Sequence, residues 1–414
     1  MGRAKDQLME EQDRGFAATG RFICQQCVSD EALRATVVDR ASAEDECSYC
    51  RTAPAASLDD VLGYMLDALR YEYRPASEES PPYDSGEGGY QARGYDLPDL
   101  LFGGLDGDFD PPQVYQDVLE AISPYLEPWF DRDWYALRPH EQVLASWRRF
   151  ATLVVRRREF ALRPRARRAG DSDEPIEPEE MLDALGQVIS RVPGAYRTLT
   201  TRRPLWRARY GPERGWRTAA DLGPPPSSVD AAAGRMNVRG ETLFYGAIEP
   251  ETAVIEKSRS SERRALSVGP FFPIRPLHLL DLTASRLPIP GIYDAGRHRT
   301  RTASMFLHEF AREIAKPVFR ADSPRYLPTQ IVTAYVRTEL SAVTGMAADG
   351  IAFASSRCPG TNVVLFVDSA GCANRDAPVT GGHLLALDGR LVAVLTPAQT
   401  RRRWLAVVGG RAGR

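Results

Sequence analysis

Apolar residues recur along this chain of 414 residues in two different patterns. In the first half they are spaced three and four residues apart, which is the spacing of an amphipathic helix. This spacing predicts four helices, over Leu58–Tyr73, Val114–Ile122, His140–Val155 and Glu179–Ile189. The segment 77–94 is rich in Ser, Pro, Gly and acidic residues, so we expect a loop there.

In the second half, short apolar runs that predict strands are mixed with helical segments. The predicted strands are Leu205–Tyr210, Leu243–Ile248, Leu277–Leu282, Gly350–Ser356 and Asn362–Val367. The predicted helices are one that Pro250 begins, Ser304–Ile314 and Thr329–Thr338. The run Leu384–Leu395 alternates about Asp388-Gly389, which predicts a tight hairpin. Because strands and helices do not alternate strictly, we expect the α+β class with a mixed sheet.

Four of the six cysteines form two Cys-x-x-Cys pairs, Cys24 with Cys27 and Cys47 with Cys50. The spacing between the pairs is typical of zinc sites in which two knuckles complete a tetrahedron of thiolates. No export signal precedes them, which favours metal binding over disulfides. We expect a structural zinc ion that stabilises this small segment. Cys358 and Cys372 stand alone and are expected to be neutral thiols.

These features divide the chain into four expected parts. A zinc-knuckle segment covers 1–56, a helical domain 57–165, a linker with a short helix 166–198, and a mixed β-sheet domain 199–414. The net charge of −2 gives no overall attraction to nucleic acid or to anionic membranes. The basic stretch Arg148–Arg168 has two interpretations, a solvated helix face or a contact for RNA, DNA or an acidic partner. Since the chain contains no apolar run that could span a bilayer, we expect a cytoplasmic protein.

The candidate chemistry lies in the stretch Gly234–Glu256. It begins with a loop that carries Arg235 and Asn237, continues into the strand that holds Tyr245, and ends in the helix of Glu256. A cation, a phenol and a carboxylate placed in this way can hold an anionic nucleotide and stabilise positive charge that develops on a sugar. Taken singly, each has an ordinary explanation: a surface ion pair, a core tyrosine or a solvated glutamate.

With Arg207 and the Ser355-Ser356 pair added, the part from about Leu205 to Val367 resembles the RES domain. The matching pieces are Leu-Trp-Arg-Ala-Arg, Gly-Arg-Met-Asn-x-x-Gly, Phe-Tyr-Gly-Ala, Thr-Ala-Val-Ile-Glu and Asp-Gly-Ile-Ala-Phe-Ala-Ser-Ser. RES domains are similar to ADP-ribosyltransferases in fold and consume NAD. Their toxin members cleave NAD with phosphate. The region before it, zinc knuckles included, resembles the HEPN/RES N-terminal region, which implies that 57–165 is HEPN-like.

The resemblance implies a role for each residue. Arg235 and Tyr245 would hold the diphosphate and the nicotinamide ribose of NAD, and Glu256 would face the ribose carbon that loses nicotinamide. The other implied site residues bind the nucleotide or complete its pocket: Arg207, Asn237, Asn362, and Ser355 or Ser356.

The expected function is that of an NAD phosphorylase or glycohydrolase, acting as a toxin or defence effector. One alternative is an ADP-ribosyltransferase that modifies a protein or nucleic acid. A second is a nucleic-acid-binding module that uses the zinc knuckles and Arg148–Arg168. The expected partners are NAD as substrate, phosphate as a co-substrate, a protein antitoxin or regulator, and a second copy of the chain in a homo-oligomer.

Overall fold

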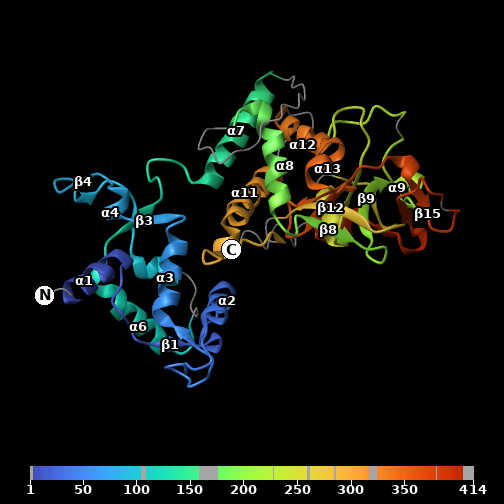
Figure 1. The fold of residues 1–414 in the computed structure, drawn as a ribbon. Helices are drawn as coiled ribbons and strands as arrows, with labels where there is room; N and C mark the ends of the chain where they lie inside the picture. Colours follow the sequence, from blue (N-terminus) through green and yellow to red (C-terminus); the bar gives the residue numbers. More distant parts are fainter. Residues whose placement is uncertain are drawn as a thin grey trace. The chain divides into compact units, whose positions relative to one another are not determined.

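A computed structural model describes residues 3–103, 109–157, 176–226, 228–258, 262–283, 286–316, 324–378 and 380–403 (Figure 1). The chain divides into two units. Unit 1 comprises Met1–Pro139 and Ile289–Arg301, and unit 2 comprises His140–Pro288 and Thr302–Arg414. The first boundary falls at the start of the predicted helix near His140, whereas the sequence analysis placed a boundary at 165.

The core of unit 1 forms around helix α3 (Leu58–Leu69), whose apolar face is buried. The buried cysteines of the knuckles, Cys24, Cys27 and Cys47, belong to the same apolar cluster as α3, so the knuckle segment and the helical region share one core. The other helices of this unit are α1 (Arg3–Arg14), α2 (Glu31–Arg40), α4 (Ala76–Glu79), α5 (Leu97–Phe102) and α6 (Pro112–Ile122). Its short strands are β1 (Phe22–Ile23), β2 (Ala56–Ser57), β3 (Tyr73–Pro75), β4 (Tyr83–Asp84), β5 (Gly89–Tyr90), β6 (Gly94–Tyr95) and β7 (Trp129–Asp131).

Helix α3 ends at Leu69, earlier than the predicted Tyr73. Tyr73 instead begins β3, where it pairs with Asp131 of β7 in a three-stranded sheet. Tertiary pairing therefore overrides the helical spacing of the last residues.

A segment from the second half of the sequence, Ile289–Arg301, belongs to unit 1. Its Tyr293 is buried, and the tyrosine hydroxyl donates a hydrogen bond of 2.5 Å to the Leu101 carbonyl. The carbonyl of Tyr293 accepts one of 2.6 Å from the Tyr64 hydroxyl, and Arg301 forms an ion pair of 2.7 Å with Glu72. This insertion has no signal in the sequence pattern, because it lies between a predicted strand and a predicted helix of the other unit.

Unit 2 contains a ten-stranded mixed sheet, in which most neighbours are antiparallel. The strand order is β15-β16-β11-β9-β10-β14-β13-β12-β8, with β17 also paired to β11. The bounds are β8 Tyr196–Leu199, β9 Leu205–Gly211, β10 Phe244–Ala247, β11 Ala265–Pro273, β12 Leu277–Leu282, β13 Gly350–Ala354, β14 Thr361–Leu365, β15 Cys372–Asn374, β16 Leu385–Leu387 and β17 Ala393–Leu395. The α+β class with a mixed sheet is thus confirmed.

A group of helices covers one face of this sheet (Figure 1). They are α7 (Pro139–Arg157), α8 (Met181–Arg191), α11 (His298–Ala315), α12 (Leu327–Thr338) and α13 (Leu340–Thr344). Aromatic residues such as Trp147, Phe150, Phe306 and Phe310 form a core with Phe353 and other residues of β12–β14. Helix α10 (Pro250–Lys257) packs through Ala253 and Val254 on β9 and β11, and a short helix, α9 (Ala219–Leu222), follows β9.

The predicted hairpin about Asp388-Gly389 is wrong. Strands β16 and β17 do not pair with each other, since both pair with the same strand, β11. Leu387 lies opposite Phe271 and Ala393 opposite Val268, so the chain continues in one direction along β11. Between the strands, the Asp388 side chain accepts hydrogen bonds from Arg390, which stabilises a short turn of 3₁₀ helix at Gly389–Leu391. The interruption between the two strands is therefore a short 3₁₀ turn and not a reversal of the chain.

Leu279 of β12 is fully buried (0% exposed), whereas Leu391 is 54% exposed. Replacing Leu279 by Ala should lower the free energy of unfolding by roughly 2–5 kcal/mol, because it leaves a cavity in the core. Leu391→Ala, the same change at the surface, should alter it by less than about 0.5 kcal/mol. Urea denaturation of both variants checks this difference. Equal effects would contradict the assigned strand register.

Candidate active site and metal centre

Glu256 lies in the last turn of α10, and its carboxylate is held from two sides. Oε1 accepts a hydrogen bond of 2.5 Å from the Ser355 hydroxyl and one of 2.7 Å from the Asn362 side-chain amide. Because Oε1 accepts both bonds, they fix the direction of the carboxylate. Neither bond involves Oε2. The structure therefore brings together three residues that the sequence analysis selected.

Ser355 is the serine that meets the glutamate. Its Oγ accepts hydrogen bonds from the backbone N–H groups of Arg357 (3.0 Å) and Cys358 (3.2 Å). Because those donors occupy its lone pairs, the Ser355 hydroxyl proton is directed at Glu256. The sequence could not choose between Ser355 and Ser356, and the geometry favours Ser355.

The loop between β13 and β14 is fastened to both ends of α10. Ser355 at its start contacts Glu256, and the N–H of Thr361 at its end donates a hydrogen bond of 2.9 Å to the Glu249 carboxylate, which precedes the helix. A Cβ at Gly360 would lie 2.0 Å from the Thr252 hydroxyl, so only glycine permits this close approach. The loop and the helix consequently form one rigid support for the carboxylate.

Tyr245 and Asn237 order the loop that carries Arg235. The Tyr245 hydroxyl donates to the Asn237 side-chain oxygen (2.7 Å) and accepts from the Met236 N–H (3.1 Å). The Asn237 amide donates to the carbonyls of Ala232, Val238 and Glu241. Burial raises the pKa of Tyr245 well above its usual value, so the phenol stays neutral. In this structure both side chains act on the loop, and their predicted contacts with NAD stay predictions.

Arg235 lies on the same face of the sheet as Glu256. Its guanidinium is 5.7 Å from the centre of the Phe353 ring, and it donates a hydrogen bond of 2.8 Å to the Ile314 carbonyl at the end of α11. Phe353 is paired with Asn362 in the β13–β14 register, and paired residues of antiparallel strands share a face. Asn362 in turn holds Glu256. Within the described ranges no ion pair involves Arg235, so its charge is suited to an anionic ligand.

Arg207 lies on the opposite face. Its guanidinium is 5.3 Å from the centre of the Phe244 ring. Successive residues of a strand point to opposite faces, and Tyr245, which follows Phe244, points to the face of Glu256. Phe244, and Arg207 with it, therefore lies on the other face. The guanidinium donates to the carbonyls of Leu222 (2.8 Å), Tyr245 (2.6 Å) and Gly223 (3.3 Å). Burial lowers its pKa to about 10, which leaves it charged at neutral pH. Arg207 thus ties neighbouring segments together, and its predicted nucleotide contact stays a prediction.

Arg357 is a further residue of the site that no sequence motif identified. Its side chain donates to the carbonyls of Glu256 (2.6 Å) and Ser258 (2.8 Å) at the end of α10. The available signal was its position directly after the Ser-Ser pair, in a polar loop between two strands.

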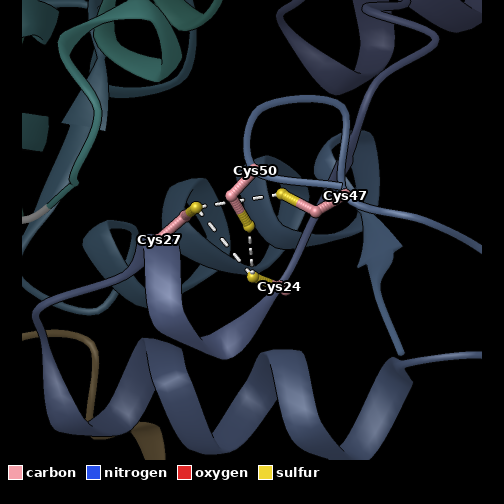
Figure 2. A group of neighbouring side chains, drawn as sticks. All are labelled: Cys24, Cys27, Cys47 and Cys50. Atoms are coloured by element: carbon pink, nitrogen blue, oxygen red, sulfur yellow. Dashed lines mark hydrogen bonds between the residues drawn. The ribbon is translucent and has the colours of Figure 1, made fainter. Parts of the chain in front are cut away.

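The four knuckle cysteines gather in unit 1 as predicted, with their sulfurs turned toward one another (Figure 2). All four Sγ atoms lie within 4.8 Å of one another, and three of the separations are 3.3 Å (Cys24–Cys50), 3.8 Å (Cys27–Cys47) and 3.9 Å (Cys24–Cys27). Zinc–sulfur bonds of about 2.3 Å in a tetrahedron place the sulfurs about 3.8 Å apart, so this arrangement fits the ion.

The electrostatics of the cluster also suit a cation. Burial raises the pKa of the Cys24 and Cys27 thiols, whereas hydrogen bonding with Thr52 lowers the pKa of the exposed Cys50 to about 6. Buried thiolates require a compensating positive charge, and a metal ion would supply it. The single cysteines lie apart from this cluster in unit 2. Cys358 is buried, and burial raises the pKa of Cys372 to about 12, so it is a neutral thiol.

The basic stretch predicted at Arg148–Arg168 is described only as far as residue 157. Arg148, Arg149, Thr152, Leu153 and Arg156 of α7 line a surface cavity of about 530 Å³. Arg148 forms an ion pair with Glu313 (2.7 Å) and Arg149 one with Glu177 (3.7 Å), so part of this charge is already neutralised. Residues 158–168 lie outside the described residues. No helix in the described ranges is long and apolar enough to cross a membrane.

Comparison with protein families matches both halves of the chain. Residues 40–167 match HEPN/RES N-terminal domain 1, and residues 204–388 match the RES domain. The chain therefore carries a region that matches a HEPN/RES N-terminal domain ahead of a region that matches the RES domain, in agreement with the resemblance seen in the sequence. The second match contains every predicted active-site residue, from Arg207 to Asn362.

No curated protein sequence matches this chain significantly. Among solved structures, a chain of the M. tuberculosis MbcT–MbcA toxin–antitoxin complex is similar, with 13% identity and a TM-score of 0.30. That match covers 53% of this chain and 96% of the other.

If the cysteine cluster holds zinc, the purified protein should contain one zinc ion per chain. Cys27→Ser should remove the ion and lower the melting temperature of unit 1, since Cys27 belongs to that unit's core. Cys372→Ser, outside the cluster, should keep the metal and serves as the control. Elemental mass spectrometry with thermal melting measures both. Full zinc content in the Cys27 variant would contradict the site.

Tyr245→Phe should lower the free energy of unfolding by about 1–3 kcal/mol, because Asn237 Oδ1 and the Met236 N–H lose their buried partner. Tyr83→Phe, at a side chain that is 65% exposed, is the matched control and should have almost no effect. Denaturant titration of the two variants measures the change in the free energy of unfolding. The prediction fails if the variants are equally stable.

Proposed function

We propose that this protein is an enzyme that consumes NAD by cleaving the bond between nicotinamide and ribose. The match to the RES domain supports this class of reaction. The observation that carries the proposal is the fixed carboxylate of Glu256 on the same sheet face as the guanidinium of Arg235. A carboxylate and a cation so arranged suit a dinucleotide, which has an anionic diphosphate and a sugar that becomes positive during cleavage.

In the proposed reaction the C–N bond to nicotinamide breaks, and its electron pair leaves with the nicotinamide ring. The ribose carbon gains oxocarbenium character, which the negative charge of Glu256 stabilises. An acceptor oxygen then forms the new bond to that carbon, from phosphate in a phosphorylase or from water in a glycohydrolase. Arg235 holds the diphosphate in this scheme, and Ser355 and Asn362 orient the glutamate.

The N-terminal unit has a separate role in this proposal. The zinc ion stabilises its fold, and the unit restrains or directs the RES domain. Because loss of NAD harms the cell that contains the enzyme, we propose a cytoplasmic toxin or defence effector with a protein antitoxin or regulator. A homo-oligomer is compatible with this arrangement.

Two alternatives remain proposals beside it. ADP-ribosyl transfer would use the same site with an acceptor on a protein or nucleic acid. Nucleic-acid binding is favoured only by the basic cavity on α7, and the ion pairs of Arg148 and Arg149 weaken that case.

The test is incubation of the purified protein with NAD, with and without phosphate, followed by chromatography of the products. Wild-type protein should release nicotinamide, and Glu256→Gln should reduce the rate about 100-fold or more, since it removes the stabilising charge. Glu251→Gln, an exposed position on the same helix, is the control and should keep the wild-type rate.

The products separate the alternatives. ADP-ribose phosphate indicates a phosphorylase, free ADP-ribose a glycohydrolase, and label that is retained on a polymer a transferase. No release of nicotinamide under any acceptor condition would overturn the proposal.

A further inference from the structure

The end of α10 is secured by a residue from another element. The last carbonyls of a helix have no partner within the helix, and its C-terminal end carries partial negative charge. Arg357, in the β13–β14 loop, donates from Nη1 to the carbonyl of Glu256 (2.6 Å) and from Nη2 to that of Ser258 (2.8 Å). The guanidinium therefore places its positive charge at the helix terminus, and its two terminal nitrogens bond two of the carbonyls there.

The same residue also supports the hydroxyl that orients the carboxylate. The backbone N–H of Arg357 donates to Ser355 Oγ (3.0 Å), and that hydroxyl donates to Glu256 Oε1 (2.5 Å). Arg357 thus acts on both the main chain that carries Glu256 and the side chain that holds its carboxylate.

Beside the bonds to the Glu256 carboxylate, the helix end also has local bonds. Ser258 is buried (1% exposed), and its N–H and hydroxyl both bond back to the Val254 carbonyl. These bonds lie within the helix, so they do not hold the helix in place against the loop that carries Ser355. Arg357 supplies a side-chain link between the two.

We propose that Arg357 is a positioning residue for the cleavage of NAD, a proposal that rests on the function proposed above. It does not touch the substrate. By clamping the terminus of α10 against the β13–β14 loop, it directs the Glu256 carboxylate at the sugar. Loss of this clamp lets the carboxylate move relative to the ribose, and a displacement of about 1 Å is enough to cost a factor on the order of 100 in rate.

The experiment compares Arg357→Ala and Arg357→Lys with Arg264→Ala. Arg264 is exposed, forms an ion pair with the neighbouring Glu262 and lies 5.5 Å from the centre of the Tyr210 ring, so it controls for loss of an arginine outside the β13–β14 loop. Arg357→Ala should lower kcat about 10- to 100-fold while KM for NAD changes less than about threefold. Arg357→Lys should retain an intermediate kcat, because one ammonium replaces only part of the fork. Millimolar guanidinium should restore part of the rate of the Ala variant.

Two kinetic outcomes would overturn the proposal. An unchanged kcat would show that the clamp is dispensable, and a raised KM with unchanged kcat would show that Arg357 binds NAD directly. The Arg264 variant should behave as wild type.

A second readout is independent of activity. Hydrogen exchange at the Ser258 amide should be faster in Arg357→Ala than in wild type, and unchanged in Arg264→Ala. If the wild-type protein releases no nicotinamide, the proposed function fails, and this exchange measurement still decides whether Arg357 holds the helix. Unchanged exchange in Arg357→Ala would overturn the clamp itself.

Discussion

The attachment of the β13–β14 loop to α10 is the constraint on which the candidate site depends. A carboxylate at the end of a short helix would ordinarily point into solvent and sample many directions. Here its oxygen is held by Ser355 and Asn362, the helix end by Arg357, and the helix start through Glu249 and Thr361. The order of this carboxylate comes from the loop, because the helix by itself is too short to provide it.

The sheet adds a second constraint. Because the side chains of a strand alternate between its two faces, Arg207 lies on one face, and Arg235 and Glu256 lie on the other. Phe353, Asn362 and Tyr245 share the face that the helices of unit 2 cover, and Arg235 and Glu256 reach that face from a loop and from α10. Arg207 lies on the other face among backbone carbonyls. Of these two arginines, Arg235 is therefore the one placed for a ligand on the glutamate face, while Arg207 bonds to backbone carbonyls on the other face.

The sequence predicted several strands and most helices of unit 2 because their apolar runs, although short, end at clear breaks, but it missed β11. The resemblance to the RES domain, and not spacing, selected Glu256, Ser355 or Ser356, and Asn362 as site residues, but the contacts of the Glu256 carboxylate with Ser355 and Asn362 come from the structure. The sequence could not predict the insertion of Ile289–Arg301 into unit 1 or the continuous path of β16 and β17 along β11, since both depend on tertiary packing. Arg357 was missed because a single arginine in a polar loop carries no pattern.

The most direct test of the central claim is a crystal structure of the inactive Glu256→Gln protein with NAD bound. Our account predicts that the diphosphate lies within hydrogen-bonding distance of the Arg235 guanidinium, with the nicotinamide ribose beside residue 256. A dinucleotide bound instead on the face of Arg207, or in the basic cavity of α7, would contradict it.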